Sequence, residues 1–380
     1  MNRNIVIVGL VSLFTDISSE MIYPLIPLYL TAVLGASPSV LGVIEGIAES
    51  LASLLKIFSG RISDRFEKRK SVAVVGYGLS ALGKVLFVVA TSWVGVLWAR
   101  IGDRFGKGIR TAPRDALIAE SVGPEARGRA FGFHRAMDTA GAVIGIITAY
   151  WLFTSYRGEY LLVFWLALIP AVLGVFCLFF ASETGQGRTA AKQAVFSWRG
   201  LDKKLRYFII VTFLFNLGNS SNQFLLVRAG TSGFSPEQVI LLYLLMNLTY
   251  FAISYPAGIV SDAIGRRSLL VAGYALYGLV YLGFGFASLT WQFIALFAVY
   301  GLYTGMTDGI EKALLADIAP PGQRATVYGL HAMTVGFALL PASLIAGLLW
   351  DAFGAAAPFW FGGVTGLLSA GAFWLGLRGT

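Results

Sequence analysis

The chain contains twelve apolar stretches, each about as long as the 20 residues that an α-helix needs to cross a bilayer. Turn residues or clusters of charge separate each stretch from the next. Of the 380 residues, 57% are hydrophobic and 13% are charged, which excludes an ordinary soluble globular domain. The stretches predict transmembrane helices at residues 5–33, 38–59, 71–91, 93–115, 129–152, 160–182, 205–228, 236–257, 268–288, 291–316, 326–349 and 357–377.

The positive charges are distributed unequally between the two sets of loops. About 20 of the 29 Lys and Arg residues fall in one set of loops and chain ends, whereas the opposite loops hold Arg157 and Arg228. Basic loops stay on the cytoplasmic side of a membrane. Both termini are therefore expected in the cytoplasm. The protein is expected in the cell membrane as a multi-pass chain, which in a bacterium is the inner membrane. The net charge of +9 then reflects topology, and we expect no nucleic-acid partner.

Motifs that would indicate an enzyme fail on inspection. Residues 78–84 have the spacing of a phosphate-binding loop, but Val85 replaces its Ser or Thr, and the stretch lies inside an apolar helix. Cys177 is the single cysteine, and the two histidines, His134 and His331, form no Cys/His cluster with it in the sequence. We expect packing or gating roles for the histidines. The sequence predicts no enzyme, no cofactor and no metal site.

A repeat divides the chain in two. The segment GRISDRFEKRK at 60–70 recurs as GIVSDAIGRR at 258–267, so that Gly60, Asp64 and Arg69 correspond to Gly258, Asp262 and Arg267 at one offset. Later matches follow an offset one residue shorter. We predict an N-terminal six-helix bundle at 1–182, a cytoplasmic linker at 183–204 and a C-terminal six-helix bundle at 205–380.

Two six-helix halves and the pattern G-x-x-x-D-R-x-x-[KR]-[KR] between helices 2 and 3 resemble the major facilitator superfamily of secondary transporters. The resemblance covers nearly the whole chain. It implies an all-α integral membrane protein with twelve transmembrane helices in two six-helix bundles, related by a pseudo-twofold parallel repeat. Glu67 and Ala263 depart from the motif. The Gly-Pro pair that drug/proton antiporters of this family carry on helix 5 is incomplete, because Ile146 follows Gly145.

The resemblance also implies a gate. In the family, the Asp of the paired motif latches the cytoplasmic side shut against the N-terminus of a helix from the other half, where an acidic group is favourable. The basic residues around it keep the loop inside the cell and contact anionic lipid. The predicted gating residues are Gly60, Asp64, Arg65, Arg69, Gly258, Asp262, Arg266 and Arg267.

Charged residues inside the first-half helices are the strongest candidates for chemistry. Each costs about 2.5–3.5 kcal/mol at a helix centre on insertion scales, so such groups face a cavity or a partner. Arg100 occupies the position of a helix-4 arginine that the family links to proton coupling, although Asp103 and Arg104 replace the family's Gln-Gly. A salt-bridge lattice holding the helices together is the alternative. The predicted substrate- or proton-binding residues here are Asp16, Glu20, Glu45, Glu49, Arg100, Asp103, Arg104 and Asp138.

The second half offers amides and phenols instead. Asn219, Asn222 and Asn247 are predicted to face the substrate cavity, whereas most of the tyrosines are expected to pack. Asp308, Glu311 and Lys312 are expected to belong to a gate. The sequence thus predicts an alternating-access transporter that moves a small organic solute, as proton-coupled efflux. Uptake of an anionic solute, or a transport-dead receptor or assembly subunit, remain the alternatives. The expected partners are the solute, protons and the lipid bilayer, and the expected state is a monomer.

Overall fold

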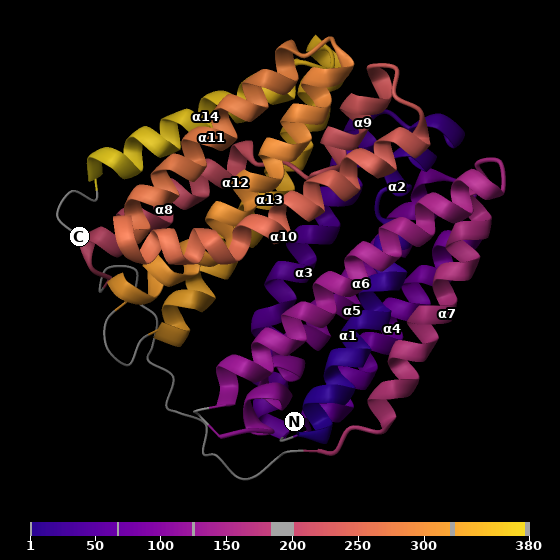
Figure 1. The fold of residues 1–380 in the computed structure, drawn as a ribbon, viewed down its shortest axis with the longest axis vertical. Helices are drawn as coiled ribbons and strands as arrows, with labels where there is room; N and C mark the ends of the chain where they lie inside the picture. Colours follow the sequence, from indigo (N-terminus) through magenta and orange to yellow (C-terminus); the bar gives the residue numbers. More distant parts are fainter. Residues whose placement is uncertain (1, 67, 124–125, 184–200, 320–323, 377–380) are drawn as a thin grey trace. The chain divides into compact units, whose positions relative to one another are not determined.

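The computed structural model describes residues 2–66, 68–123, 126–183, 201–319 and 324–376, and nearly all of these residues are helical (Figure 1). The elements up to residue 183 are α1 Arg3–Ile22, α2 Ile26–Leu28, η1 Tyr29–Val33, α3 Pro38–Phe66, α4 Arg69–Val89, α5 Trp93–Glu120, α6 Arg127–Ser155 and α7 Tyr160–Phe179. Those after residue 200 are α8 Lys203–Gly218, α9 Gln223–Thr231, α10 Pro236–Ile264, α11 Arg266–Phe286, α12 Thr290–Ile318, α13 Arg324–Phe353 and α14 Ala357–Gly376.

These helices form the twelve expected spans. The first span is composite, because α1, α2 and the π-helical η1 follow one another, and α8 and α9 together form the seventh. Ten helices among the described residues are long and apolar enough to cross a membrane by themselves. Two spans do not meet these criteria. The fourth, α5, carries a dense row of charges, and the seventh is divided into α8 and α9, which contain only 16 and 9 residues. The prediction of an all-α membrane protein is confirmed.

The chain divides into two compact units. The first contains residues 1–36 and 47–191, and the second contains residues 37–46 and 192–380. The first turns of α3 therefore belong to the second unit, where Gly42 and Gly46 pack against the backbone of α13 at Ser343 and Leu340. A side chain at either glycine would overlap that backbone.

Close helix packing organises the first unit. Gly83 and Gly106 bring α4 and α5 together at backbone contact, which places side chains of α5 directly beside those of α4. In the same unit, α6 packs on α1 through Gly141 and Gly145. Inside a membrane the hydrophobic effect does not drive helices together, so close packing matters more, and small residues allow two helix backbones to come into contact.

An aromatic core organises the second unit. Phe215 of α8 stacks on Tyr274 of α11 with ring centroids 3.7 Å apart, and Tyr277 and Tyr281 continue the row along α11. All three tyrosines are fully buried. The expectation that most tyrosines of this half pack is in keeping with this core.

The repeated motif is more helical than the sequence suggested. The second and eighth helices were expected to end at residues 59 and 257, but α3 continues to Phe66 and α10 to Ile264. Only Gly265, with φ of 91°, separates α10 from α11. Glycine adopts this left-handed backbone at little cost, so the chain can turn within one residue.

This short turn corrects the register of the repeat. Arg69 is the first residue of α4, and Arg266 is the first residue of α11. Arg69 therefore corresponds in structure to Arg266 and not to Arg267. The offset shortens inside the turn, before α11 begins. The ion pairs of the two units agree with this alignment, as described below.

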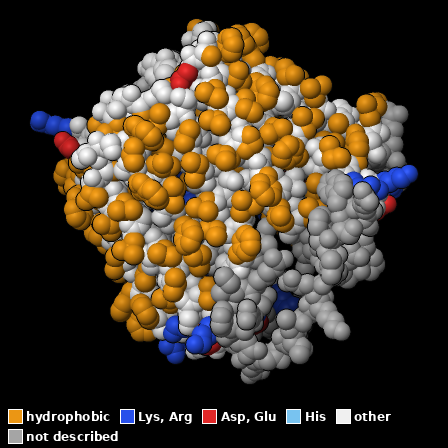
Figure 2. All heavy atoms as spheres, turned by 180° about the vertical axis from the view of Figure 1, so that it is seen from behind, with side chains coloured by type: hydrophobic (Ala, Val, Ile, Leu, Met, Phe, Trp, Pro, Cys, Tyr) orange, Lys and Arg blue, Asp and Glu red, His pale blue; other side chains and the backbone are white. Residues whose placement is uncertain are grey.

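The exposed surface is apolar. Figure 2 shows hydrophobic side chains spread over one face, with most of the visible charged groups near its margins. Large side chains such as Trp98, Phe176 and Phe286 are 60%, 57% and 70% exposed. On a soluble protein, so many exposed large apolar side chains would indicate a binding surface. Here they are the surface expected to face lipid.

Candidate functional site

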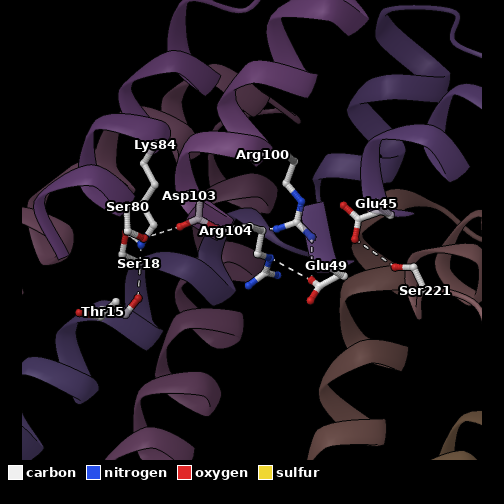
Figure 3. A network of polar contacts seen from close by, with 10 residues as sticks. All are labelled: Thr15, Ser18, Glu45, Glu49, Ser80, Lys84, Arg100, Asp103, Arg104 and Ser221. Atoms are coloured by element: carbon white, nitrogen blue, oxygen red, sulfur yellow. Dashed lines mark hydrogen bonds and ion pairs between the residues drawn. The ribbon is translucent and has the colours of Figure 1, made fainter. Parts of the chain in front are cut away.

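A network of charged side chains lies inside the first unit, on α1, α3, α4 and α5 (Figure 3). The row of charges on α5 supplies most of it, because helical spacing points Arg100, Asp103 and Arg104 away from lipid. Arg100 and Asp103 are 2% and 6% exposed. The network is built from groups that the sequence had singled out, together with Ser18, Ser80 and Lys84, which it had not.

Glu49 of α3 holds two arginines of α5. Its Oε1 lies 2.9 Å from Nε of Arg104 and 3.4 Å from Nη2 of Arg100. The guanidinium of Arg100 also lies 5.5 Å from the ring centroid of Tyr23, which adds a cation–π contact. One carboxylate thus neutralises part of the charge of two cations that apolar surroundings would otherwise disfavour.

Asp103 is held from a different side. It accepts a 2.5 Å hydrogen bond from the hydroxyl of Ser80 on α4 and lies 3.8 Å from Nη1 of Arg100. Arg100 therefore links the Glu49 carboxylate to the Asp103 carboxylate. A proton bound by either acid would weaken its attraction for the shared guanidinium and so change the other contact.

Lys84 is the charged residue of the network that sequence reasoning missed. It is 2% exposed, and its ammonium donates to the Ser18 hydroxyl at 2.9 Å and lies 3.4 Å from the Thr15 carbonyl oxygen. The signal was present, because a lysine far inside the apolar run 71–91 has to find partners within the protein. It had been considered only as part of a phosphate-binding loop.

Asp16 and Glu20 of α1 line a small pocket of about 30 Å³ beside this network. The pocket is large enough for a water molecule or a single small group. The charged residues around it are Asp16, Glu20, Lys84, Arg100, Asp103, Arg104, Lys107 and Arg110. The structure therefore brings five cations and three acids to one point inside the first unit.

Asp138 of α6 does not line the pocket, although its charge acts on Asp16, which does, and it lies near His134 on the same helix. Nε2 of His134 is 2.6 Å from the hydroxyl of Ser12 and 3.8 Å from Oδ1 of Asp138. The contact between His134 and Ser12 joins α6 to α1. The role of Asp138 in binding stays a prediction.

Glu45 belongs to the second unit and is fully buried. It accepts a 3.0 Å hydrogen bond from the hydroxyl of Ser221, which lies in the break between α8 and α9. Figure 3 shows the two side chains pointing toward each other. Irregular backbone inside a membrane is tolerated where it is buried in protein or lines a cavity.

The break in the seventh span also places the predicted asparagines. The Asn222 side chain accepts a 2.6 Å bond from the Tyr300 hydroxyl, and the Gly218 carbonyl at the end of α8 accepts one from Tyr277. Asn219 is the residue that ends α8. Asn247 donates to the Tyr243 carbonyl one turn back in its own helix. Substrate contact by the three asparagines stays a prediction.

The gating residues are described in part. The side chains of Asp64 and Arg65 and the surroundings of Gly60 lie outside what the structure describes. Arg69 pairs with Glu120 at 3.1 Å, and Arg266 pairs with Asp317 at 2.6 Å, which matches the corrected repeat register.

The remaining motif residues differ in their contacts. Asp262 lies 3.7 Å from Arg266 and is largely exposed, whereas Arg267 donates to the carbonyl oxygens of Phe373 and Trp374. Gly258 lies within α10 with open space beside it. The gating role of the set stays a prediction.

Fold and site together define a membrane transporter, since repeated halves with ionisable groups inside the spans are the arrangement of secondary transporters. The family profile described as Major Facilitator Superfamily matches residues 8–228 and 208–380. The chain belongs to this superfamily, as its sequence motif predicted, and it is a transporter and not an enzyme.

Individual relatives agree with this assignment. The chain is 38% identical over 361 residues to an uncharacterized MFS-type transporter of Methanocaldococcus jannaschii, covering 92% of this chain and 89% of that protein. It is 28% identical to the multidrug resistance protein MdtH of Photorhabdus laumondii subsp. laumondii, covering 81% and 77%. In fold it is similar to the crystal structure of a mutant of the nucleoside transporter NupG, with a TM-score of 0.79, 14% identity and coverage of 98% and 99%.

Proposed function

We propose that this transporter exports a small organic solute by alternating access and that protons entering through the first-unit carboxylates drive the export. The observation that carries the proposal is the position of Glu49 and Asp103 inside the membrane spans, each in contact with Arg100. Buried acids and bases in a bilayer are costly, so their presence at one point favours a functional role.

Proton binding has a direct physical consequence in this network. A neutral Glu49 no longer attracts Arg100 and Arg104, and a neutral Asp103 no longer attracts Arg100. The released guanidinium charge then needs another anion or a different helix arrangement. This is how protonation of a carboxylate biases one conformation of a carrier over another.

Outward direction is supported by relatives. Several proteins named multidrug resistance protein MdtH, from different bacteria, match more than four fifths of the chain at 25–28% identity. Their name describes them and not this chain. We extend it here to the proposal of efflux from the cytoplasm across the cell membrane, the inner membrane in a bacterium, by a monomer whose termini are both cytoplasmic.

Uptake of an anionic solute is the second candidate. One observation favours it: the pocket beside Asp16 and Glu20 is lined by five cationic side chains against three acidic ones. An excess of positive charge in a low-dielectric site attracts an anion. The two candidates differ in substrate charge and in direction, so one flux experiment separates them.

The test uses purified protein in proteoliposomes with an imposed pH gradient and a panel of radiolabelled cationic, neutral and anionic solutes. Under the proposal, the gradient drives solute movement opposite to the protons. Movement of an anionic solute with the protons would replace efflux by the second candidate. If no solute of the panel moves, proton-coupled transport is wrong, and the receptor or assembly alternative takes its place.

Substitutions test the site. Asp103→Asn and Glu49→Gln are expected to lower gradient-driven flux at least tenfold, because neither amide can release a proton. The matched control is Glu159→Gln, which changes an exposed carboxylate just before α7. Solute exchange at equal pH on both sides shows whether binding survives. Undiminished gradient-driven flux in both site variants would remove these two acids from the coupling mechanism.

A further inference from the structure

A wide apolar groove lies between α3, α4 and α5 of the first unit. Its volume is about 460 Å³, whereas the charged pocket beside Asp16 and Glu20 measures about 30 Å³. The residues described around the groove and those around the charged pocket are different ones. The apolar wall of the groove consists of Leu55, Phe58, Val72, Val75, Phe105 and Ile109. Its volume is typical of the sites in which proteins bind small molecules.

The groove opens on the part of the surface that is expected to face lipid. Phe58 and Val75 belong to its wall and are 55% and 56% exposed. The hydroxyl of Ser59 also lines it, but this hydroxyl donates to the Gly108 carbonyl oxygen of α5 at 2.9 Å. A water molecule needs two to four polar partners, and this wall offers few. A hydrocarbon chain needs none, so it is the better occupant of the groove inside a membrane.

One end of the groove is polar. Lys68 and Ser71 line it where α4 begins, and both side chains are exposed. Val75 lies seven residues after Lys68, which is about 10 Å along a helix axis. The headgroup layer on each side of a bilayer is roughly 5–8 Å thick. Because Lys68 belongs to the basic segment expected at the membrane surface, a groove of this length extends from the headgroup layer into the hydrocarbon region, as a phospholipid does.

The other two cations at the start of α4 already have partners. Arg69 pairs with Glu120 at 3.1 Å, and the Lys70 ammonium donates to the Phe179 carbonyl oxygen at 2.7 Å. The contacts described for the Lys68 side chain include no carboxylate. The N-terminal end of a helix also favours an anion nearby. Among the described cations of this segment, Lys68 is therefore the one best placed to bind a phosphate group.

We propose that this groove binds one acyl chain of an anionic phospholipid, whose phosphate is held by Lys68 and Ser71. The sequence led us to expect only that the basic residues of the repeated motif contact lipid headgroups, which attract such residues. The groove adds a place for the chain, and the pairing of Arg69 and Lys70 singles out one lysine. The inference goes beyond the proposed efflux and does not rest on it, since the occupant is a lipid and not the solute.

The unchanged full-length protein tests the occupant first. Purified protein in detergent is mixed with phosphatidylglycerol or with phosphatidylcholine that carries the same chains. Native mass spectrometry should show one phosphatidylglycerol retained per protein chain and far less phosphatidylcholine. Because a ligand that binds only the folded state stabilises it, phosphatidylglycerol should also raise the unfolding temperature more, in a saturable way. Equal retention of the two lipids, or retention of neither, overturns the proposal.

Lys68→Gln tests the headgroup contact. Loss of a hydrogen bond between charged groups should weaken phosphatidylglycerol binding about tenfold or more, toward the level of phosphatidylcholine. The matched control is Lys204→Gln, which removes an exposed lysine from the first turn of α8 that does not line the groove. An equal loss of binding in the two variants would indicate general attraction between charges and would contradict the site.

Val75→Trp tests the chain contact. The larger side chain fills part of the groove, so retention of both lipids should fall although the charge of Lys68 is kept. Val85→Trp is the control, because Val85 is an exposed residue of the same helix that does not line the groove. Should Val75→Trp not fold, Val75→Phe makes the same comparison with less added volume. Unchanged retention of phosphatidylglycerol in a folded Val75 variant overturns the assignment of the groove.

An apolar solute is the alternative occupant, and the outcomes distinguish it from a lipid. If a solute of the transport panel binds in a way that Val75→Trp abolishes, and no lipid is retained, the groove belongs to the solute and the proposal is wrong. The efflux proposal fails separately. Retained phosphatidylglycerol without flux of any solute keeps the groove assigned to lipid and removes efflux, whereas gradient-driven flux without retained lipid keeps efflux and removes the lipid site.

Discussion

Single residues inside the spans differ in whether their partners carry charge. Arg100 connects two carboxylates, Glu49 and Asp103. Lys84 is equally buried, but the described partners of its ammonium are a hydroxyl and a carbonyl oxygen. Removing one member of a buried ion pair leaves an uncompensated charge. Removing Lys84 breaks no ion pair among the described contacts, but it takes away a positive charge that acts on nearby Asp103 and Asp16.

The substitutions Arg100→Met and Lys84→Met are therefore expected to differ in stability. Arg100→Met leaves two buried carboxylates without this partner and should destabilise the protein by about 3–5 kcal/mol. Lys84→Met keeps the volume, Ser18 still donates to the Ala167 carbonyl, and Asp103 keeps Arg100 and Ser80 as contacts, so the loss should be clearly smaller than that of Arg100→Met. Thermal unfolding in detergent, followed by size-exclusion chromatography, compares the two. Equal losses would contradict this account of the network.

At the residue scale, the sequence predicted which groups are unusual but not how they pair. An acid or arginine in an apolar run is visible without any structure, and Glu49, Asp103 and Arg100 were found in this way. Their pairing depends on the rotation of α3 and α5 about their own axes, which the one-dimensional pattern does not contain. Glu311 and His331, whose Oε1 and Nε2 atoms lie 2.9 Å apart, were assigned to gating or packing for the same reason.

At the scale of elements, glycines decide which helices meet. Gly141 and Gly145 of α6 both face α1, and a Cβ atom at each would lie 2.5 Å from the carbonyl oxygens of Leu13 and Ile17. The sequence had used this stretch only to compare it with an antiporter signature. The structure shows it as a packing motif in which two glycines one turn apart allow close contact.

The substitution Gly145→Ala is expected to push α6 away from α1. Overpacking of this kind costs about 1–3 kcal/mol, because a helix backbone has to move and not only a side chain. Gly132→Ala is the matched control on the same helix, since nothing lies within 4 Å of a Cβ atom there. The control should be neutral or slightly stabilising, because alanine favours helix over glycine. The thermal unfolding temperatures of the two variants are compared with that of the unchanged protein. A Gly145→Ala variant as stable as the unchanged protein would contradict the packing assignment.

Helix ends were the least predictable elements. The predicted second helix stopped at the charged motif, because charge was taken to mark the loop. The helix continues to Phe66, since polar residues do not break a helix that has left the hydrocarbon region. The break in the seventh span was not predicted at all. Residues 219–222 lack proline and glycine, and the break is held by tertiary contacts such as that between Tyr300 and Asn222.

At the scale of the whole molecule, the repeat is preserved in the ion pairs at the start of α4 and α11. Arg69 binds Glu120, and Arg266 binds Asp317, at equivalent places in the two units. Exposed pairs of this kind contribute about 0–1 kcal/mol each, so their stabilising effect is small. Their recurrence is better explained by the shared geometry of the two halves.

Topology is the prediction that belongs to the entire chain. If the basic loops lie inside the cell, both termini are cytoplasmic. A fluorescent protein fused after Thr380 should then fluoresce, and alkaline phosphatase fused there should be inactive, because it needs the oxidising side of the membrane. Fusions after Arg157 serve as the control and should give the reverse pattern. An active C-terminal phosphatase would contradict the predicted orientation.

The sequence by itself determined that this is a membrane protein of twelve spans in two repeated halves. Those properties follow from hydrophobicity and charge counted along the chain, and each span can be recognised without its neighbours. The sequence motif also identified the superfamily. The tertiary structure alone decided that Lys84 is buried, that Arg100 connects Glu49 to Asp103, and that Glu311 meets His331. Such contacts depend on which helices are neighbours and how each is rotated, and these are properties of packing in three dimensions.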